Sequence, residues 1–533
     1  MSNKNSILQE ESTRTSGRDA IINNIDSIYA LSEIVKTTLG PLGMDKMLID
    51  SVGDTIITND GVQILKSMDI DHPAAKLIIE VAKTQDSVVG DGTTSCVILI
   101  ANILQEAKKL YLLGIHPNII LKHFLQGLNH AIKSLPSYAT DISNNMQYYL
   151  EQIIITAMRG KSSEEYSQYL ATLLVQHILK ITNNSINSTH LDTFSKKKFK
   201  TLKIVGPPIT SSKIINGIVF DKKRLLQSMP KYLSNPNILI CSCPIEVQEI
   251  ENSHQIQISN YQEYEQFIIQ EKKYLNSIAQ KIIELKVNVV ICQKGVDDSI
   301  VSMLAKHNIL VLRRCKKSDI EHLSTHSKAQ ILHNLDLLSY EYIQKINSVE
   351  VIEFEKEEVI SFEIKETSFL SMIVCASTYH IVDEIDRAIE DSIGDVSNAL
   401  VNKKIVGGGG SSFMNIYTEL QTLSTQREGK EQLILEHLAN SFLSIPKILS
   451  QNSGFDEIET LSSLKHQHLQ NNHLSGIDCT KGVVEDVLKS NIIEPIGVLE
   501  QILLSSKEAI SLILRIDDII AAKKIDTNSI QMD

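Results

Sequence analysis

Apolar residues recur every three or four positions over most of the first 180 residues, which is the spacing of helices that bury one face. The pattern predicts helices over 21–39, 73–84, 95–113, 117–135 and 146–180, the last with a break at 158–162. Two short apolar stretches, 46–49 and 54–58, predict strands. They lead to Asn59-Asp60-Gly61, which by itself is typical of a hairpin turn.

The middle of the chain follows a different pattern. Short strands predicted at 238–241, 289–292 and 310–312 alternate with helices, including a long helix over 261–285, as in an α/β unit. Helical spacing returns over 381–400 and, except near 476–494, continues to about residue 522. We therefore expect the two ends of the chain to form one largely helical domain, with the α/β middle inserted into it.

Length and charge narrow the class of protein. A chain of 533 residues is long enough for roughly three domains. The net charge of −12 offers no basic surface for nucleic acid or an anionic membrane. No apolar run approaches the ~18 residues of a membrane-spanning helix, and the polar N-terminus lacks the apolar stretch of a signal peptide. Seven scattered cysteines fit reduced thiols and a cytoplasmic location, with Cys241 and Cys243 expected in the core.

A glycine-rich segment at 89–95, Val-Gly-Asp-Gly-Thr-Thr-Ser, opens directly into a predicted helix. A helix start offers unpaired backbone N–H groups and the positive end of the helix dipole, which both suit a phosphate. Asp91 suits the Mg²⁺ that accompanies a nucleotide, because hard cations prefer carboxylate oxygens. A second loop, 38–43, contains two glycines and a proline that free the backbone for close approach to phosphate. An ordinary capped turn explains an isolated Gly-Asp-Gly equally well.

Together the motifs resemble those of a group II chaperonin subunit, the family of archaeal thermosomes and of the eukaryotic cytosolic TRiC/CCT ring. The segments that carry the resemblance fall in family order and spacing across nearly the whole chain: 37–48, 58–61, 72–76, 90–94, 114–117, 293–295, 408–410 and 514–518. Four further segments are most similar to the epsilon subunit of the eukaryotic ring: 238–246, 292–298, 452–454 and 476–479. The N-terminal third is more similar to the thermosomes.

The resemblance implies an α/β multidomain chaperonin fold with three domains. A mainly helical equatorial domain would comprise 1–146 and 404–533 and bind ATP. An α/β intermediate domain, 147–216 and 369–403, would act as a hinge. An α/β apical domain, 217–368, would bind unfolded protein and carry a helical protrusion at about 247–274 that closes as a built-in lid.

The resemblance also implies roles for individual residues. Asp91 would bind Mg²⁺, Asp60 and Asp391 would position and activate the attacking water, and Lys161 would sense the γ-phosphate of ATP. The residues expected to hold the phosphates are Leu39, Gly40, Pro41, Gly92, Thr93, Thr94 and Ser95. Those expected to face adenine and ribose are Gly408, Gly409, Asp478 and Glu494. On the sequence alone, Asp391 is one acid among several on a solvated helix face, and its place in the 386–391 motif favours the catalytic interpretation.

The function implied is that of an ATPase subunit that encloses and folds unfolded proteins in a double ring, with paralogous chaperonin subunits and unfolded clients as partners. Two alternatives stay open: a small-molecule kinase or another soluble ATP-using enzyme, and a ring subunit with a mainly structural and client-contact role. No Gly-x-x-x-x-Gly-Lys-Ser/Thr motif supports the kinase. For client contact we expect the predicted helices that begin near Ser299 and Asp319 to present a mixed apolar and polar surface. Their apolar residues are Ile300, Val301, Met303, Leu304, Ile320 and Leu323, some of them expected in the core.

Overall fold

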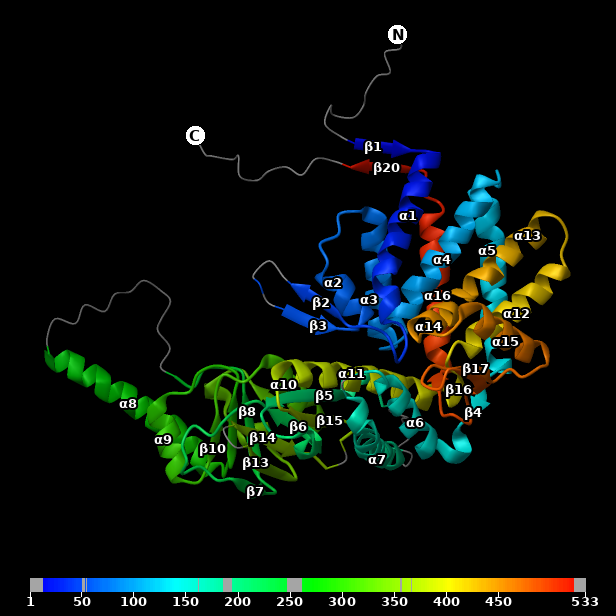
Figure 1. The fold of residues 1–533 in the computed structure, drawn as a ribbon. Helices are drawn as coiled ribbons and strands as arrows, with labels where there is room; N and C mark the ends of the chain where they lie inside the picture. Colours follow the sequence, from blue (N-terminus) through cyan, green and yellow to red (C-terminus); the bar gives the residue numbers. More distant parts are fainter. Residues whose placement is uncertain are drawn as a thin grey trace, which may run out of the picture. The chain divides into compact units, whose positions relative to one another are not determined.

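The computed structural model describes residues 13–49, 53, 55–161, 163–185, 194–246, 261–354, 357–365 and 367–521 (Figure 1). The chain divides into two compact units. The first joins Met1–Ala171 to Arg387–Asp533, and the second is the segment Thr172–Asp386. The two ends of the chain thus share one unit, as the return of helical spacing after residue 381 predicts.

Helices form the core of the first unit. Helix α4 (Thr93–Leu112) has ten buried residues, because its apolar residues are not confined to one stripe. It packs against α1 (Arg18–Val35), α3 (Pro73–Val88) and α16 (Ile496–Ile513), so the blue start and the red end of the chain lie side by side (Figure 1). The same core includes α5 (Pro117–Ser134), α12 (Ser411–Thr425), α13 (Lys430–Phe442), α14 (Ser444–Asn452) and α15 (Glu457–Leu469).

Short antiparallel pairings complete this unit. Strand β1 (Thr13–Ser16) pairs with β20 (Asp518–Ala521), and β2 (Lys46–Ile49) pairs with β3 (Thr55–Thr58), as the sequence predicts for 46–49 and 54–58. Strand β16 (Lys404–Gly407) lies between β4 (Thr140–Asp141) and β19 (Ile493–Pro495). Strand β17 (Ser475–Asp478) forms a hairpin with β18 (Val483–Asp486). Two of these pairings, β1 with β20 and β4 with β16, join segments from the two ends of the chain.

Two local predictions are corrected. The helix predicted over 21–39 ends at Val35, and a 3-10 turn (Lys36–Thr38) follows it. The segment Asn59-Asp60-Gly61 is not a hairpin turn, because α2 (Gly61–Ser67) begins there. Asp60 is the N-cap of this helix, and its Oδ1 accepts a hydrogen bond from the Val62 backbone N–H at 3.0 Å. The start of a helix therefore positions this carboxylate.

Three more helices follow the predicted pattern. Helices α6 (Met146–Met158) and α7 (Ser167–Ser185) confirm the helical stretch over 146–180 and its break. Helix α11 (Tyr379–Asn402) matches the one predicted over 381–400, and from Arg387 onward it belongs to the first unit.

The second unit is α/β, as predicted. Strands β10 (Leu310–Leu312), β9 (Val289–Cys292), β8 (Asn237–Cys241) and β11 (Ile331–Leu332) pair in parallel, and β12 (Ile343–Lys345) adds to β8 antiparallel. Helices α8 (Tyr261–Glu284), α9 (Asp298–Lys306) and α10 (Lys317–Ser327) connect them. A six-stranded sheet contains, in order, β5 (Phe199–Val205), β15 (Leu370–Ala376), β6 (Lys213–Phe220), β14 (Glu357–Glu363), β13 (Ser348–Phe354) and β7 (Tyr232–Ser234).

The mixed surface expected on α9 and α10 lacks most of its apolar part, because five of its six apolar residues lie in the core. Ile300, Val301, Leu304, Ile320 and Leu323 are buried in the core of the second unit, and only Met303 is half-buried. An apolar stripe at helical spacing normally faces the core, and here it packs on the sheet. Of the predicted protrusion, 247–260 lies outside the described residues, while the long helix predicted over 261–285 is present as α8.

The cysteines agree with a simpler expectation. All seven cysteines are free and buried, Cys241 and Cys243 among them. Within the part of the chain that the structure describes, no helix has both the length and the apolar character needed to cross a membrane.

Candidate functional site

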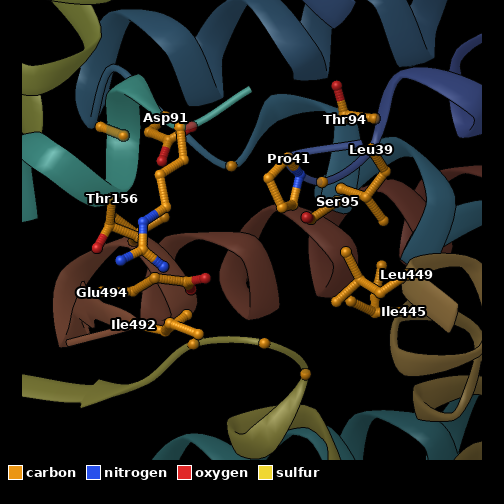
Figure 2. Close-up of a pocket in the computed structure, with 18 of the residues that line it drawn as sticks. Leu39, Pro41, Asp91, Thr94, Ser95, Thr156, Ile445, Leu449, Ile492 and Glu494 are labelled. Carbon is orange, nitrogen blue, oxygen red and sulfur yellow. The ribbon is translucent and has the colours of Figure 1, made fainter. Parts of the chain in front are cut away.

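A pocket of about 250 Å³ lies in the first unit (Figure 2). Every residue that the sequence analysis singles out for ATP, Mg²⁺ or hydrolysis lines it. The set is Leu39, Gly40, Pro41, Asp60, Asp91, Gly92, Thr93, Thr94, Ser95, Lys161, Asp391, Gly408, Gly409, Asp478 and Glu494. Side chains separated by more than 400 positions in the chain therefore surround one cavity. Their individual roles stay predictions.

The start of α4 provides one wall suited to an anion. Gly92 is the N-cap of the helix, with a left-handed φ of 74°, and no side chain caps the first turn. The backbone N–H groups at such a start point toward a ligand. A Cβ at Gly92 would lie 2.8 Å from the side chains of Val498 and Ile502, so glycine is required by packing as well as by conformation. The start of α4 thus lies close against α16, and its first residues line the cavity.

Two other glycine loops approach the same cavity. Gly40 has φ 88°, and a Cβ there would lie 2.6 Å from Leu449. At the start of α12, Gly410 is an N-cap with φ 76° and again no side chain caps the helix. Figure 2 shows Leu39, Ile445 and Leu449 as apolar side chains around one end, while Asp91, Thr156 and Glu494 lie around the other. The cavity therefore has an apolar end and an acidic end.

An ion pair stands at the acidic end. Lys161 Nζ donates to Asp391 Oδ2 at 2.7 Å, and both side chains are about one-fifth exposed. Burial alone would lower the pKa of Lys161, but the neighbouring carboxylates, Asp391 first, raise it, so the ammonium stays charged. Burial raises the pKa of both Asp60 and Asp91, and the charge of Asp391 raises them further. Burial also raises the pKa of Glu494, to about 7, with the charge of Asp91 as the second cause.

The charge of the pocket fits a nucleotide that arrives with a cation. Seven carboxylates line it, against the two basic side chains Arg159 and Lys161. A bare triphosphate would be repelled from such a site, and Mg²⁺ bound to its phosphates would reduce that repulsion. Among the described residues, no three His, Cys, Asp or Glu side chains form a metal cage. Mg²⁺ usually takes only one or two carboxylates and completes its shell with phosphates and water, so Asp91 fits as its protein ligand.

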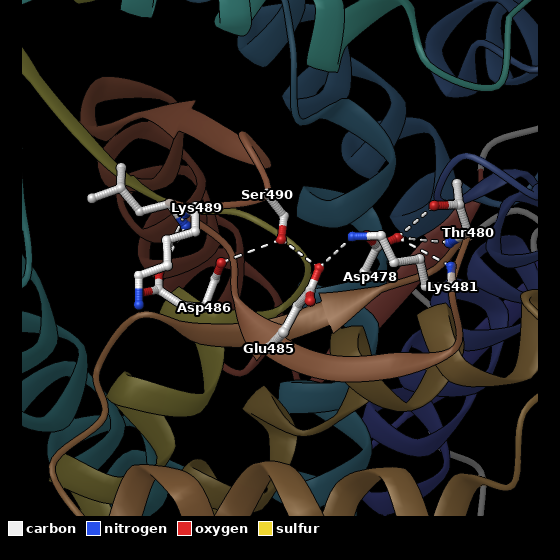
Figure 3. Close-up of polar contacts among 8 residues, drawn as sticks. Asp478, Thr480, Lys481, Glu485, Asp486, Lys489 and Ser490 are labelled. Atoms are coloured by element: carbon white, nitrogen blue, oxygen red, sulfur yellow. Dashed lines mark hydrogen bonds and ion pairs between the residues drawn. The ribbon is translucent and has the colours of Figure 1, made fainter.

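Asp478 holds a turn in place, which the sequence analysis did not predict (Figure 3). Its Oδ1 accepts hydrogen bonds from the Thr480 backbone N–H at 2.9 Å, the Thr480 hydroxyl at 2.6 Å and the Lys481 N–H at 3.2 Å. Lys481 Nζ lies 3.0 Å from Oδ2 and bridges to Glu485 at 2.7 Å. Burial alone would raise the pKa of Asp478, but these hydrogen bonds hold it well below its usual range. The carboxylate thus fixes the β17–β18 turn, which supports one side of the pocket.

Comparison with known proteins agrees with the geometry. The model of the TCP-1/cpn60 chaperonin family matches residues 31–524. The chain belongs to this family. It is 39% identical over 520 residues to a thermosome subunit of Methanopyrus kandleri, with 97% of this chain and 95% of the relative covered. Thermosome subunits beta and alpha of Methanothermobacter thermautotrophicus are 39% and 38% identical, each with at least 97% of this chain and 94% of the relative covered. Membership confirms the multidomain chaperonin fold with helical and α/β parts.

Some residues of this chaperonin pocket were not predicted. Asp395 is nearly fully buried and stands one helical turn after Asp391, a spacing that places the two on one face of α11. Thr156 donates to the backbone carbonyl of Asn491, which ties α6 to the loop before β19. The i, i+4 spacing of Asp391 and Asp395 could have predicted that both side chains lie on the same face of the helix. Nothing in the sequence marks Ile445, Leu449 and Ile492, which line the pocket as ordinary apolar residues.

Proposed function

We propose that this chain is an ATP-hydrolysing subunit of a double-ring chaperonin that encloses and folds unfolded proteins. Chaperonins of this family are ATPases that drive protein folding. The observation that carries the proposal for this chain is the single pocket in which uncapped helix starts, several carboxylates and a charged lysine meet.

The proposed chemistry uses the chain's own groups to position and to stabilise charge, which is most of what phosphoryl transfer requires. The backbone of the 39–41 loop and the N–H groups at the start of α4 hold phosphate oxygens. The adenine and ribose face Gly408, Gly409, Asp478 and Glu494. Asp91 holds Mg²⁺, which, when bound, neutralises charge on the phosphates. Asp60 and Asp391 orient the attacking water and accept its proton, and Lys161 stabilises the terminal phosphate. Leu39, Ile445 and Leu449 exclude bulk water from the apolar end.

We further propose the three-domain organisation implied by the resemblance: equatorial 1–146 and 404–533, intermediate 147–216 and 369–403, and apical 217–368. Asp391 then belongs to the hinge, while Asp91 and the phosphate loops belong to the equatorial domain. A site that is complete only when the hinge contributes its carboxylate couples nucleotide state to hinge position. The lid at about 247–274 would follow that motion.

The finer assignment concerns the kind of ring. We propose paralogous chaperonin subunits and unfolded clients as partners, in a cytoplasmic hetero-oligomer of the eukaryotic TRiC/CCT type with this chain in the epsilon-like place. The thermosome alpha and beta subunits of Methanothermobacter thermautotrophicus support a ring of related subunits. The epsilon-like place is supported by the four segments named above. Identifying the other subunits of the purified native particle tests it.

One experiment tests the proposed function against the kinase alternative. The native particle, purified through a tag on this chain, is passed over a gel-filtration column and each fraction is assayed for ATP hydrolysis. A megadalton peak with ATPase activity is expected, and Asp91→Ala should assemble into the same peak with the activity of this subunit lost. A monomer or dimer that phosphorylates a small molecule would overturn the proposal. An assembled ring in which Asp91→Ala changes no hydrolysis would instead support a mainly structural subunit.

A further inference from the structure

Asp395 is an acidic residue for which the chemistry described so far has no use. It follows Asp391 by four residues on α11, its side chain is 2% exposed, and it lines the pocket. Its Oδ1 is buried and has no hydrogen-bond partner within the described residues. Leaving a buried polar oxygen unpaired is costly, and more so for a charged group. Such an oxygen therefore indicates a ligand that lies outside the polypeptide.

The surroundings of Asp395 are negative. The carboxylates of Asp91, Asp391 and Glu494 all act on it electrostatically, and Asp91 lies within hydrogen-bonding contact. Lys161 is the cation that acts on this group, yet its ammonium is bound to Asp391 at 2.7 Å. Two carboxylates in contact repel each other unless a shared proton or a metal ion lies between them. A hard divalent cation would give the unpaired oxygen of Asp395 a partner and would also supply positive charge between the carboxylates, because such a cation prefers carboxylate oxygen.

The neighbouring residue explains how Asp395 comes so close to Asp91. A Cβ on Gly394 would lie 2.3 Å from the Val89 carbonyl oxygen and 3.0 Å from Gly90 Cα. The backbone of α11 therefore contacts the loop that carries Asp91, and only glycine permits that contact. The next residue of the helix is Asp395, so the close approach brings its carboxylate to the glycine loop.

We propose that Asp395 is a second carboxylate of the divalent-cation site and acts together with Asp91. The proposal rests on the proposed function, since the cation enters with the nucleotide. Asp91 and Asp395 would supply the protein oxygens, and phosphate and water would supply the rest. Two carboxylates rather than one would hold the cation more tightly and would restrict where it can lie relative to Asp391.

The test uses the assembled particle and Mn²⁺, which takes the same carboxylate and water ligands as Mg²⁺ and is read by electron paramagnetic resonance. Mn²⁺ is titrated in the presence of a non-hydrolysable ATP analogue, and analogue binding is measured separately in EDTA. The variants are Asp395→Asn, Asp91→Asn and, as a matched control on the same helix, Asp383→Asn, whose carboxylate pairs with Lys203 at 2.7 Å and does not line the pocket. If Asp395→Asn fails to assemble, the smaller Asp395→Ser replaces it.

Asp395→Asn should weaken Mn²⁺ binding by on the order of tenfold or more, the scale for losing a group that supports a metal site. Its metal-free affinity for the analogue should stay equal or become tighter, because one negative charge is gone. Asp383→Asn should match the wild type in both measurements.

Three results would contradict the inference or the proposed function. Unchanged Mn²⁺ affinity in Asp395→Asn overturns this inference alone. Equal losses of Mn²⁺ affinity and of metal-free analogue affinity would show that Asp395 only supports the fold. That result also overturns this inference. A wild-type particle that binds neither the analogue nor Mn²⁺ with it overturns the proposed function instead.

Discussion

Lys161 and Asp391 form the ion pair on which the proposed hydrolysis depends. Each side chain is about one-fifth exposed, so neither charge is fully hydrated, and the 2.7 Å contact holds both in one geometry. The lysine thereby holds the Asp391 carboxylate in place beside the cavity. In the proposed reaction, an entering phosphate gives the same ammonium a second acceptor, and the carboxylate becomes available to water. The pair therefore acts on a step after binding.

Asp391→Asn tests whether the ion pair acts on hydrolysis and not on nucleotide binding. The amide keeps the shape but is no base, so ATP affinity should stay within about tenfold, roughly 1.4 kcal/mol, while hydrolysis slows by a factor on the order of 10² or more. Nucleotide binding and single-turnover hydrolysis are measured on the same assembled particle. Equal loss of binding and hydrolysis would show that Asp391 belongs to the phosphate cradle or to folding.

Glu494 predicts a pH dependence of stability in the nucleotide-free protein. Its pKa rises from about 4.5 to about 7 on folding, so between these values the folded state binds a proton that the unfolded state has released. The free energy of unfolding therefore falls as pH rises through this window, and the loss is complete above pH 7. Glu494→Gln is neutral throughout and should raise the unfolding temperature relative to wild type at pH 8 but not near pH 4.5. The same difference at both pH values would contradict this explanation.

At the scale of elements, the pocket is built where helices start and where one helix touches a loop. The starts of α4 and α12 have glycine N-caps, so no side chain occupies their N–H groups. Helix α11 contacts the glycine loop through Gly394. Because this contact is backbone against backbone, it cannot adjust by a change of rotamer.

Gly394→Ala is therefore expected to destabilise the protein by about 1–3 kcal/mol, the usual cost of overpacking, and to weaken nucleotide binding by moving the glycine loop. Gly127→Ala in α5 is the matched control, since its Cβ would meet only the ends of leucine side chains, Leu438 nearest at 2.5 Å. Gly127→Ala should lower the free energy of unfolding by less than Gly394→Ala does, because a leucine can change rotamer and alanine favours the helix. Chemical denaturation and ATP binding of the two variants are compared. Equal effects would mean that helical glycines are simply sensitive to substitution here.

At the scale of the whole molecule, each unit has a core of its own. The first contains the helices around α4, and the second contains the parallel sheet with α9 and α10 packed on it. Residues 194–376 include all strands of both sheets of the second unit. A segment with its own buried core is expected to fold by itself.

We therefore predict that residues 194–376, produced alone, unfold in one cooperative thermal transition followed by circular dichroism. Ile240→Ala, at a fully buried position of β8, should lower the free energy of unfolding by about 2–5 kcal/mol. Val205→Ala, at a position 45% exposed in β5, should change it by no more than about 0.5 kcal/mol. A fragment without a cooperative transition would show that the second unit depends on the first.

Much of the secondary structure and the membership of the pocket could be predicted from the residues. Helices α3 to α7 and α11, and strands β8 to β10, lie close to where spacing and turn residues place them, because those signals are local. All predicted site residues line one pocket, since the motifs of the resemblance keep their order. The role of Asp60 as a helix cap and the turn-holding bonds of Asp478 were missed, because both depend on what the neighbouring backbone does.

Periodicity alone shows that the helix over 381–400 has an acidic face, but it does not distinguish an acid in water from one in a cavity. Packing decides that question: Gly394 admits the glycine loop, and so Asp395 loses its water and contacts Asp91. Packing also turns the apolar residues of α9 and α10 inward, where the pattern allowed a binding surface. The pattern of side chains along a helix shows which of its faces is apolar or acidic. What that face meets depends on segments hundreds of residues away, which only the folded chain brings into contact.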